Sequence, residues 1–216
     1  MSSYFVTGTD TNSGKTIITT ALVKLLRSRS MNVVPFKPVQ TGGIADTEFS
    51  LKNNSIFSDP KEFYSYSFKT ACSPHLASEL ENVQISIEKI VEDFNVLVAK
   101  YENVIVEGAG GVMVPLGNGL YILDLIIKLD LPVILVVANK LGAINQALLT
   151  IDKLDSVGCA PELLVFNDLG IEEEEILTNN VKAVMAVSGI RSVRIPFMLN
   201  LNFDKVVQIL GDSFGY

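Results

Sequence analysis

Residues 8–16 read Gly8-Thr9-Asp10-Thr11-Asn12-Ser13-Gly14-Lys15-Thr16, and they connect the apolar run Tyr4–Thr7 to the amphipathic stretch Lys15–Ser28. A glycine-rich turn that follows a strand and opens a helix with Gly-Lys-Thr is typical of a phosphate-binding P-loop. Its backbone N–H groups surround phosphate oxygens, and the helix N-terminus adds positive potential. Five residues separate Gly8 from Gly14, with Thr9 at the position of the usual first glycine. We predict a nucleoside triphosphate site, with ATP as the ligand.

Two side chains of this loop have specific tasks in that interpretation. Lys15 would contact the β- and γ-phosphates, and the hydroxyl of Thr16 would ligate Mg²⁺. The residues that we expect around the phosphates are Asp10, Thr11, Asn12, Ser13, Gly14, Lys15, Thr16 and Ile17.

Outside the loop, short β-branched runs alternate with longer helical patterns. In the first helix, Ile18, Leu22 and Leu25 keep the helical spacing of apolar residues. Further strands are predicted at Val33–Lys37, Asn103–Val106, Val133–Ala138, Glu162–Phe166 and Ser192–Ile195. Further helices are predicted at Ile85–Lys100, Ile122–Leu129, Ala143–Val157 and Glu172–Val187. This alternation predicts an α/β fold: a single P-loop-type domain over residues 1–216, with a mostly parallel sheet and helices on both faces.

The composition excludes several classes of protein. The net charge of -7 and the lack of a basic stripe argue against a nucleic-acid partner. Mean hydropathy is high, at +0.36, but apolar runs such as Leu131–Ala138 are too short to span a membrane. The start of the chain shows no basic segment followed by an apolar one, so we expect a cytoplasmic protein. His75 is the one histidine and Cys72 and Cys159 are the two cysteines, which leaves too few ligands for a zinc site. We expect both cysteines to be small core residues.

Two further motifs follow predicted strands. Val104-Ile105-Val106-Glu107 continues into Gly108-Ala109-Gly110-Gly111, so that a carboxylate and then a glycine-rich turn end an apolar strand. A carboxylate beside a P-loop can hold the metal ion. Phe36-Lys37-Pro38-Val39-Gln40-Thr41-Gly42-Gly43 ends another strand and brings Lys37 to the same edge of the sheet. The polar segment Thr41–Cys72 after it shows little periodicity, and we expect an excursion over the sheet.

Two asparagines could read the base. Asn139-Lys140-Leu141-Gly142 is similar to the guanine-reading pattern of GTPases, but Gly142 replaces the required aspartate, which argues against GTP. Asn167, at the end of the next strand, offers both a donor and an acceptor to an adenine edge.

Taken together, these motifs resemble the dethiobiotin synthetase family. The matching stretches are YFVTGTDTNSGKT, FKPVQTGG, Asp46, CSPHLAS, VIVEGAGGVMVPL, LPVILVVANKLGAINQALLT, FND and RIPFML, from residue 4 to about residue 199. The five-residue gap in the loop is similar to that of the family. The resemblance implies ring closure of 7,8-diaminopelargonic acid with CO₂ or bicarbonate, driven by ATP and Mg²⁺, through a carbamate and a carbamic–phosphoric anhydride.

The resemblance also implies roles for residues. It implies that Lys37, Lys15 and Thr11 are catalytic, that Thr16, Asp46 and Glu107 bind Mg²⁺, and that the substrate contacts Thr41, Gly110, Gly111 and Asn145. The nucleotide would in addition contact Glu107, Gly108, Asn167, Pro196, Phe197 and Met198. The family places the substrate tail near the partner subunit's loop, here Leu141–Asn145, which implies a homodimer with composite sites.

Three alternatives remain at this stage. A partition- or division-type ATPase would share the fold, but Thr9–Ser13 lack the extra lysine that such proteins usually carry. An amidating synthetase of the cobyrinate type needs a glutaminase domain for which this chain has no room. A related ligase could act on another diamine or amino acid.

Overall fold

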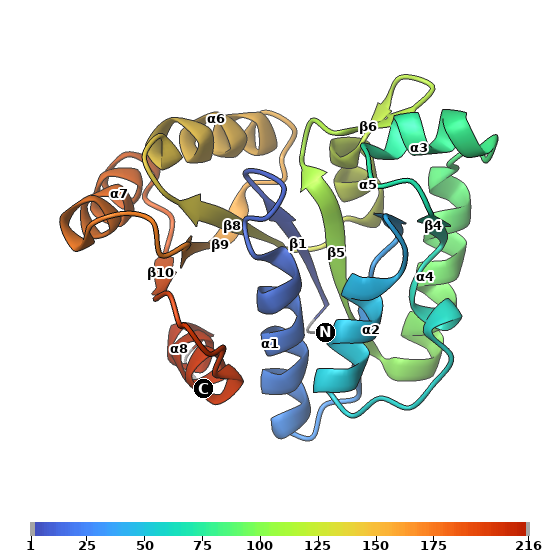
Figure 1. Cartoon of the computed structure of the whole chain (residues 1–216), viewed down its shortest axis with the longest axis horizontal. Coiled ribbons are helices and arrows are strands. Elements are labelled where there is room, and N and C mark those ends of the chain that lie inside the picture. Colours follow the sequence, from blue (N-terminus) through green and yellow to red (C-terminus); the bar gives the residue numbers. More distant parts are fainter. Residues whose placement is uncertain (1–2, 215–216) are drawn as a thin grey trace.

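The computed structural model describes residues 3–214, so the first two and last two residues of the predicted domain lie outside it. Its centre is a parallel sheet of six strands in the order β10-β9-β8-β1-β5-β2 (Figure 1). The strands are β1 (Tyr4–Gly8), β2 (Val33–Phe36), β5 (Asn103–Gly111), β8 (Val133–Asn139), β9 (Pro161–Asp168) and β10 (Ser192–Ile195). All six predicted strands are confirmed, and the parallel α/β fold with them.

Helices cover both faces of this sheet. One face packs against α1 (Lys15–Ser28) and α8 (Phe203–Phe214), and the other against α4 (Ile87–Tyr101), α5 (Ile122–Leu129), α6 (Ala143–Asp155) and α7 (Glu174–Ser188). In Figure 1, α2 (Ala45–Asn53) lies beside α1. None of the helices in the described part of the chain is long and apolar enough to cross a membrane.

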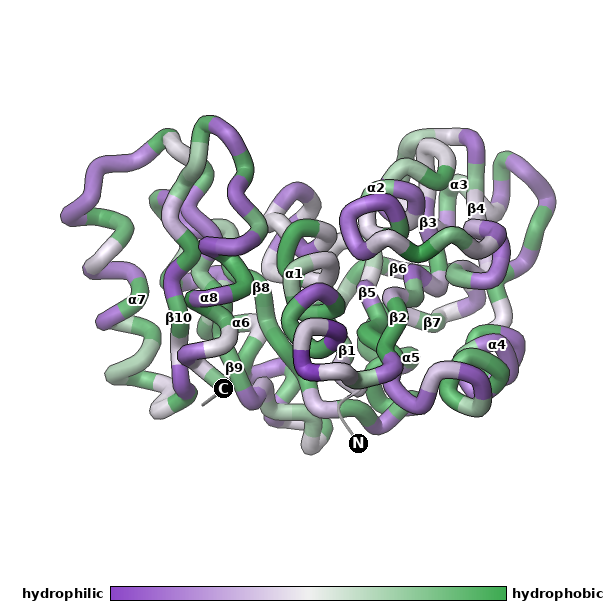
Figure 2. Tube along the Cα trace, turned by 90° about the horizontal axis from the view of Figure 1, so that it is seen from below, coloured by the Kyte–Doolittle hydropathy of each residue, from purple (hydrophilic) through white to green (hydrophobic). Residues whose placement is uncertain are grey.

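The core follows from the alternation of side chains along buried strands. On β8, Ile134 and Val136 join the layer under α1, whereas Leu135 and Val137 face α6 and α7. A strand with helices on both sides has no polar face, which explains the continuous apolar runs and the high mean hydropathy. Figure 2 shows β8 mostly green, whereas purple segments are common on the outer loops and helix turns.

The site is positioned by the transition from β1 to α1. Gly14 caps α1 with a left-handed backbone, at a φ of 99°, a conformation that glycine adopts without strain. A Cβ at this position would lie 2.3 Å from Nδ2 of Asn167, so glycine also allows the close approach of β9. The helix then buries Ile18, Leu22 and Leu25, as its apolar stripe predicts.

Several elements were not predicted. The excursion Thr41–Cys72 contains three of them: α2, the 3-10 helix η1 (Pro60–Phe63) and β4 (Tyr66–Phe68), which pairs with β3 (Val39–Thr41). The others are α3 (Pro74–Glu81), α8, and the small hairpin of β6 (Pro115–Gly117) and β7 (Leu120–Tyr121). The helix α2 is short and weakly amphipathic, so contacts with α1 rather than its own pattern stabilise it.

Three local expectations were wrong. The glycines after Glu107 do not form a turn, because β5 continues through them to Gly111. Cys72 and Cys159 are half-buried and pack against the edge of the core rather than lying within it. The predicted helix Glu172–Val187 begins at Glu174, since Glu173 is its extended N-cap residue. Elsewhere the predicted ends of elements differ by a few residues, as is usual for frayed termini.

Candidate active site

The P-loop is held in shape by its own lysine. Nζ of Lys15 donates a hydrogen bond of 2.7 Å to the carbonyl oxygen of Asp10, and Oδ1 of Asp10 accepts one of 2.7 Å from the backbone N–H of Thr11. The hydroxyl of Thr9 accepts a hydrogen bond from the backbone N–H of Ala138 on the neighbouring strand. The loop is therefore tied both internally and to β8, and the Lys15 ammonium lies over it.

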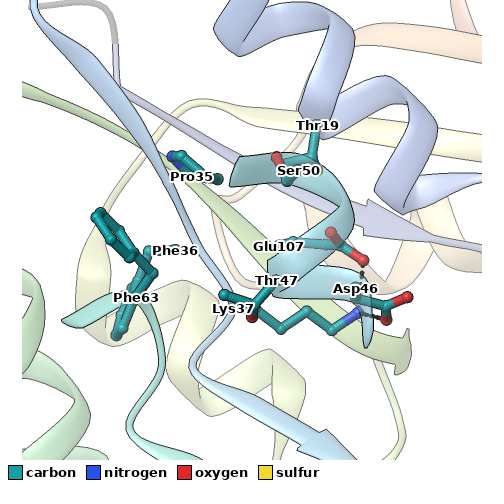
Figure 3. A pocket seen from close by; sticks show the side chains of 9 residues that line it. All are labelled: Thr19, Pro35, Phe36, Lys37, Asp46, Thr47, Ser50, Phe63 and Glu107. Atoms are coloured by element: carbon teal, nitrogen blue, oxygen red, sulfur yellow. Dashed lines mark hydrogen bonds and ion pairs between the residues drawn. The ribbon is translucent and has the colours of Figure 1, made fainter. Parts of the chain in front are cut away.

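A charged cluster lies next to the loop. Nζ of Lys37 is 2.5 Å from Oε1 of Glu107 and 2.6 Å from Oδ2 of Asp46 (Figure 3). The Thr16 hydroxyl donates a hydrogen bond of 2.7 Å to the same Oε1. Lys37 follows β2, Glu107 lies within β5, Asp46 is in the first turn of α2, and Thr16 is in the first turn of α1. The cluster therefore joins four elements, and Glu107 on β5 is 70 residues from Lys37 in the sequence.

Burial and charge act differently on the two lysines. Burial lowers the pKa of Lys15 to about 8; Glu107 partly offsets this effect, and Lys37 adds to it. Burial also acts to lower the pKa of Lys37, but the carboxylates of Glu107 and Asp46 outweigh it, and the pKa of Lys37 lies above the ordinary value for lysine. At neutral pH both ammonium groups are charged, and Lys15 is the one that titrates at mildly alkaline pH.

A cavity of about 750 Å³ opens over this cluster. It contains the predicted catalytic and metal-binding side chains together with Thr41 and Gly110. Its lining residues are Thr11, Asn12, Gly14, Lys15, Thr16, Ile17, Lys37, Val39, Gln40, Thr41, Asp46, Ala71, Cys72, Ser73, Pro74, Glu107, Ala109, Gly110 and Val114.

A second cavity of about 230 Å³ lies on the other side of Gly14. Asn167 lies in its wall, and Nδ2 of Asn167 donates a hydrogen bond of 3.1 Å to the carbonyl oxygen of Ser13. The amide is thus oriented by the P-loop, and Oδ1 is left as an acceptor. The lining residues are Asn12, Gly14, Ile17, Asn167, Asp168, Leu169, Ile195, Pro196, Phe197, Met198 and Leu201. Asn12, Gly14 and Ile17 line both cavities, so one elongated ligand can span the two.

Asn139, the other base-reading candidate, belongs to a buried hydrogen-bond network. It is fully buried, donates to Oδ1 of Asp168 at 2.7 Å and accepts from Nδ2 of Asn180 at 2.9 Å. Arg194 completes this network with an ion pair of 2.7 Å to Oδ2 of Asp168. Asn139 therefore connects β8, β9 and α7, and it is not among the residues that line either cavity.

Some predicted site residues lie apart from the two cavities. A Cβ on Gly108 would contact the ring of Phe5 in the core, and one on Gly111 would contact the carbonyl oxygen of Gly8. The latter shows that Gly111 lets β5 approach the P-loop. Asn145 is exposed and lines a separate groove between α6 and α7, so it is not part of its own chain's pocket.

Sequence reasoning missed part of the cavity wall. The segment from Ala71 to Pro74 lines the larger cavity, together with Val39, Gln40 and Val114. The CSPHLAS match pointed to this segment, but His75, which it also contains, is not among the lining residues. Val39 and Val114 are apolar residues of the wall, and a sequence motif does not distinguish such residues from core residues.

The oxygen atoms of the cluster fit a magnesium ion. The Thr16 hydroxyl and the carboxylates of Glu107 and Asp46 are hard oxygen ligands, the kind that Mg²⁺ prefers. The Lys37 ammonium already contacts both carboxylates, which shows that one cation can reach them together. Mg²⁺ is usually bound by one or two carboxylates plus phosphate oxygens, and this site adjoins the P-loop.

Fold and site together define a P-loop nucleotide-dependent enzyme. The sequence profile of a family described as AAA domain matches residues 2–203. Two solved structures share the fold. The MinC:MinD cell division protein complex of Aquifex aeolicus matches with a TM-score of 0.61 and 14% identity, over 100% of this chain and 90% of that chain. A ParA family ATPase from Chlorobium tepidum matches with a TM-score of 0.56 and 11% identity, over 96% of this chain and 88% of that chain. At these identities the likeness concerns the fold alone.

Curated relatives identify the family. The chain is 40% identical over 198 residues, 88% of each chain, to the ATP-dependent dethiobiotin synthetase BioD of Fusobacterium nucleatum. It is 41% identical over 191 residues, 82% of each chain, to a protein of the same name from Lysinibacillus sphaericus. The chain belongs to the ATP-dependent dethiobiotin synthetase family of ligases. This decides against the partition-type alternative, whose members share only the fold.

Proposed function

We propose that this protein closes the ureido ring of dethiobiotin from 7,8-diaminopelargonic acid and CO₂, with ATP and Mg²⁺. One amine adds to CO₂ and loses a proton, which forms a carbamate. A carbamate oxygen attacks the γ-phosphorus of ATP and ADP leaves, which forms a carbamic–phosphoric anhydride. The second amine then attacks the carbonyl carbon, phosphate leaves, and the cyclic urea remains. The observation that supports this proposal best is the Lys37–Glu107–Asp46–Thr16 cluster inside one cavity with the P-loop.

The two lysines supply positive charge where anions must meet. A carbamate and a γ-phosphate repel each other, and Lys15 and Lys37 line the same cavity. Lys37 stabilises the carbamate and the transferring phosphoryl group, and Lys15 holds the phosphates in the P-loop. When bound through Thr16, Asp46 and Glu107, Mg²⁺ would neutralise phosphate charge. Because these groups are already placed before substrate binds, positioning accounts for much of the catalysis.

The diamine occupies the open side of the larger cavity in this proposal. Thr11, Thr41 and Gly110 line that space, and their hydroxyl and backbone groups would contact the amines and the carbamate. The apolar residues Val39 and Val114 line the same cavity and suit the methylene groups between the reacting amines and the carboxylate tail.

The nucleotide lies across both cavities. Its phosphates bind residues 10–17, and its adenine enters the smaller cavity, where Oδ1 of Asn167 accepts from the exocyclic amino group. The segment Pro196–Met198 forms the other wall. Asn145 acts on the partner subunit's substrate in a homodimer with composite sites. We place this biosynthetic reaction in the cytoplasm.

Phosphate release by the purified protein tests this proposal, with Mg-ATP and bicarbonate in the presence and absence of 7,8-diaminopelargonic acid. We expect strong stimulation by the diamine and a cyclic urea product in mass spectrometry. If ATP binds but the diamine causes no stimulation, the substrate assignment is wrong, and other diamines and amino acids become the substrates to test.

A further inference from the structure

A small cavity lies beside the charged cluster, between α1, α2 and the strands β2 and β5 (Figure 3). Its volume is about 10 Å³, which is the size needed to hold one water molecule. Three hydroxyl residues line it, and one of them, Thr47, already donates a hydrogen bond of 3.1 Å to Oε1 of Gln40. The other lining residues are Thr19, Pro35, Phe36, Lys37, Asp46, Ser50, Phe63 and Glu107. Thr19 is 1% exposed and Ser50 is 2% exposed, and neither residue lines the open cavity in which the reaction is proposed.

Thr19 and Ser50 differ from other helical hydroxyls of this protein. A serine or threonine within a helix commonly donates to the carbonyl oxygen four residues earlier. Thr20, Thr150 and Ser188 do so, at 2.6 to 2.8 Å. The hydroxyls of Thr19 and Ser50 have no protein partner among the described residues, although both are buried. Two such hydroxyls, from two different helices, line the same cavity.

An unsatisfied buried hydroxyl costs free energy, so two of them in contact with one cavity indicate a shared polar ligand. Within residues 3–214, both hydrogen bonds that Glu107 accepts through its side chain fall on Oε1. The second oxygen, Oε2, can accept from a further donor. A water molecule can donate two hydrogen bonds and accept two. It can therefore accept one hydrogen bond from each of the two hydroxyls and donate one to Oε2 of Glu107.

We infer that this cavity is a buried water site, and that the water connects Thr19 of α1 and Ser50 of α2 to Glu107. Thr19 and Ser50 are then positioning residues. Through the water they support Oε2 of Glu107, whereas Thr16 and Lys37 both donate to its other oxygen, Oε1. The site couples the position of Glu107 to both helices that carry the other proposed metal ligands.

The first test is a double-mutant cycle on the purified protein with Thr19→Val and Ser50→Ala. If one water bridges both hydroxyls, each single change displaces it and lowers the midpoint of thermal unfolding by about 2–4 °C. The double variant then shows about the same shift as one single variant, because the water is lost only once. If the hydroxyls have no ligand, each change removes an unsatisfied group and raises the midpoint, and the shifts add. That result would overturn the inference.

Thr7→Val is the matched control. Thr7 is fully buried and its hydroxyl also has no protein partner in the described chain, but it does not line this cavity. Its shift should add to that of Ser50→Ala. A crystal structure at high resolution tests the site directly: density that hydrogen-bonds to both hydroxyls supports the inference, and a cavity without density contradicts it.

The effect on metal binding rests on the proposed function and needs its own measurement. Removal of a residue that supports a metal ligand typically weakens metal affinity by about tenfold or more. Thr19→Val should therefore weaken binding of ADP with Mg²⁺ about tenfold, and leave binding of ADP in EDTA unchanged. An equal loss in both conditions would contradict the positioning role. If the wild-type protein shows no effect of Mg²⁺, the proposed metal site is wrong, whereas the thermal cycle still tests the water site.

Discussion

Nζ of Lys37 and Oε1 of Glu107 lie 2.5 Å apart in a buried site. The pair joins the end of β2 to the middle of β5 and places a permanent positive charge where carbamate and γ-phosphate are proposed to react. Lys37 is not part of the loop that is proposed to hold the phosphates, so we propose a role for it that differs from that of Lys15.

Lys37→Ala should lower turnover by about 10²–10³-fold, because one preorganised charge for the transition state is lost. Binding of ADP should change little, since ADP has no γ-phosphate for Lys37 to contact. Isothermal titration calorimetry and phosphate-release assays measure the two effects. Lys52→Ala, an exposed position on α2, is the control and should change neither. An equal loss of ADP affinity in Lys37→Ala would show that the lysine acts in nucleotide binding.

The proposed metal ion would use the carboxylates that Lys37 contacts, so the two cations should compete in the nucleotide-free protein. Lys37→Met removes the charge and keeps most of the length of the side chain. We expect Mn²⁺, as a probe of the magnesium site, to bind this variant about tenfold more tightly than wild type, because the attraction of Glu107 and Asp46 is no longer offset. Electron paramagnetic resonance of free Mn²⁺ measures this. Unchanged affinity would mean that the metal does not use these oxygens.

Lys15 should make nucleotide binding depend on pH. Its pKa is lowered to about 8, so above this pH the free protein has a neutral Lys15, and binding of phosphate anions must take up a proton. The affinity for ADP should fall as pH rises from about 8, by up to tenfold per unit. Calorimetry in buffers of different ionisation enthalpy detects the proton uptake. Constant affinity up to pH 9.5 would argue against a charged Lys15 in the complex.

The same lowered pKa has the opposite effect on stability. Between about 8 and the ordinary value of 10.5 the unfolded chain binds the proton of Lys15 and the folded protein does not. The contribution of this group to the free energy of unfolding therefore rises with pH over that window.

Asn167 should decide between adenine and guanine. Asn167→Ala removes the acceptor for the exocyclic amino group, and we expect the preference for ATP over GTP in kcat/KM to fall about tenfold. Asn139→Ala is the comparison, because Asn139 is buried away from both cavities. It should lower the free energy of unfolding by about 1–3 kcal/mol and leave the ATP-to-GTP ratio unchanged. If Asn139→Ala changed the ATP-to-GTP ratio and Asn167→Ala only lowered stability, Asn139 would be the base-reading residue.

Asn145 tests the composite site. A mixture of Lys37→Ala and Asn145→Ala proteins forms heterodimers after subunit exchange. In each heterodimer, one site combines Lys37 of the Asn145→Ala chain with Asn145 of the other chain and is wild type. Activity should therefore reappear in the mixture, although each variant alone is impaired. Light scattering gives the oligomeric state. If activity does not reappear in proven heterodimers, Asn145 does not act across an interface.

Much of this fold could be predicted because its signals are local. The helix α1 begins and ends at the predicted residues, since Gly14 caps it and the apolar spacing of Ile18 and Leu22 fits one buried face. Strands buried on both faces appear as apolar runs whatever their neighbours are. By contrast, α2 has a weak pattern of its own, so its helical state and the position of Asp46 depend on packing against α1.

The two asparagines show where local information ends. In sequence, Asn139 and Asn167 both stand at the end of an apolar strand. In the sheet, Asn139 pairs with Asp168 and Asn167 pairs with Ala138, so their side chains lie on opposite faces. One therefore enters a buried network and the other reaches the P-loop. The register of β8 with β9 decides which asparagine lies on which face of the sheet, and a sequence motif does not give that register.

By itself the sequence determined the P-loop, the parallel α/β architecture and the family, because turn chemistry and strand periodicity are properties of short segments. The resemblance assigned Asp46 and Glu107 to one metal site, but only the tertiary structure showed that Lys37 pairs with both carboxylates. Lys37, Asp46 and Glu107 are up to 70 residues apart, and they form one cluster because parallel strands and the helices after them bring their ends to a single edge of the sheet. Contacts between distant segments depend on register and packing, and those arise only when the whole chain is folded.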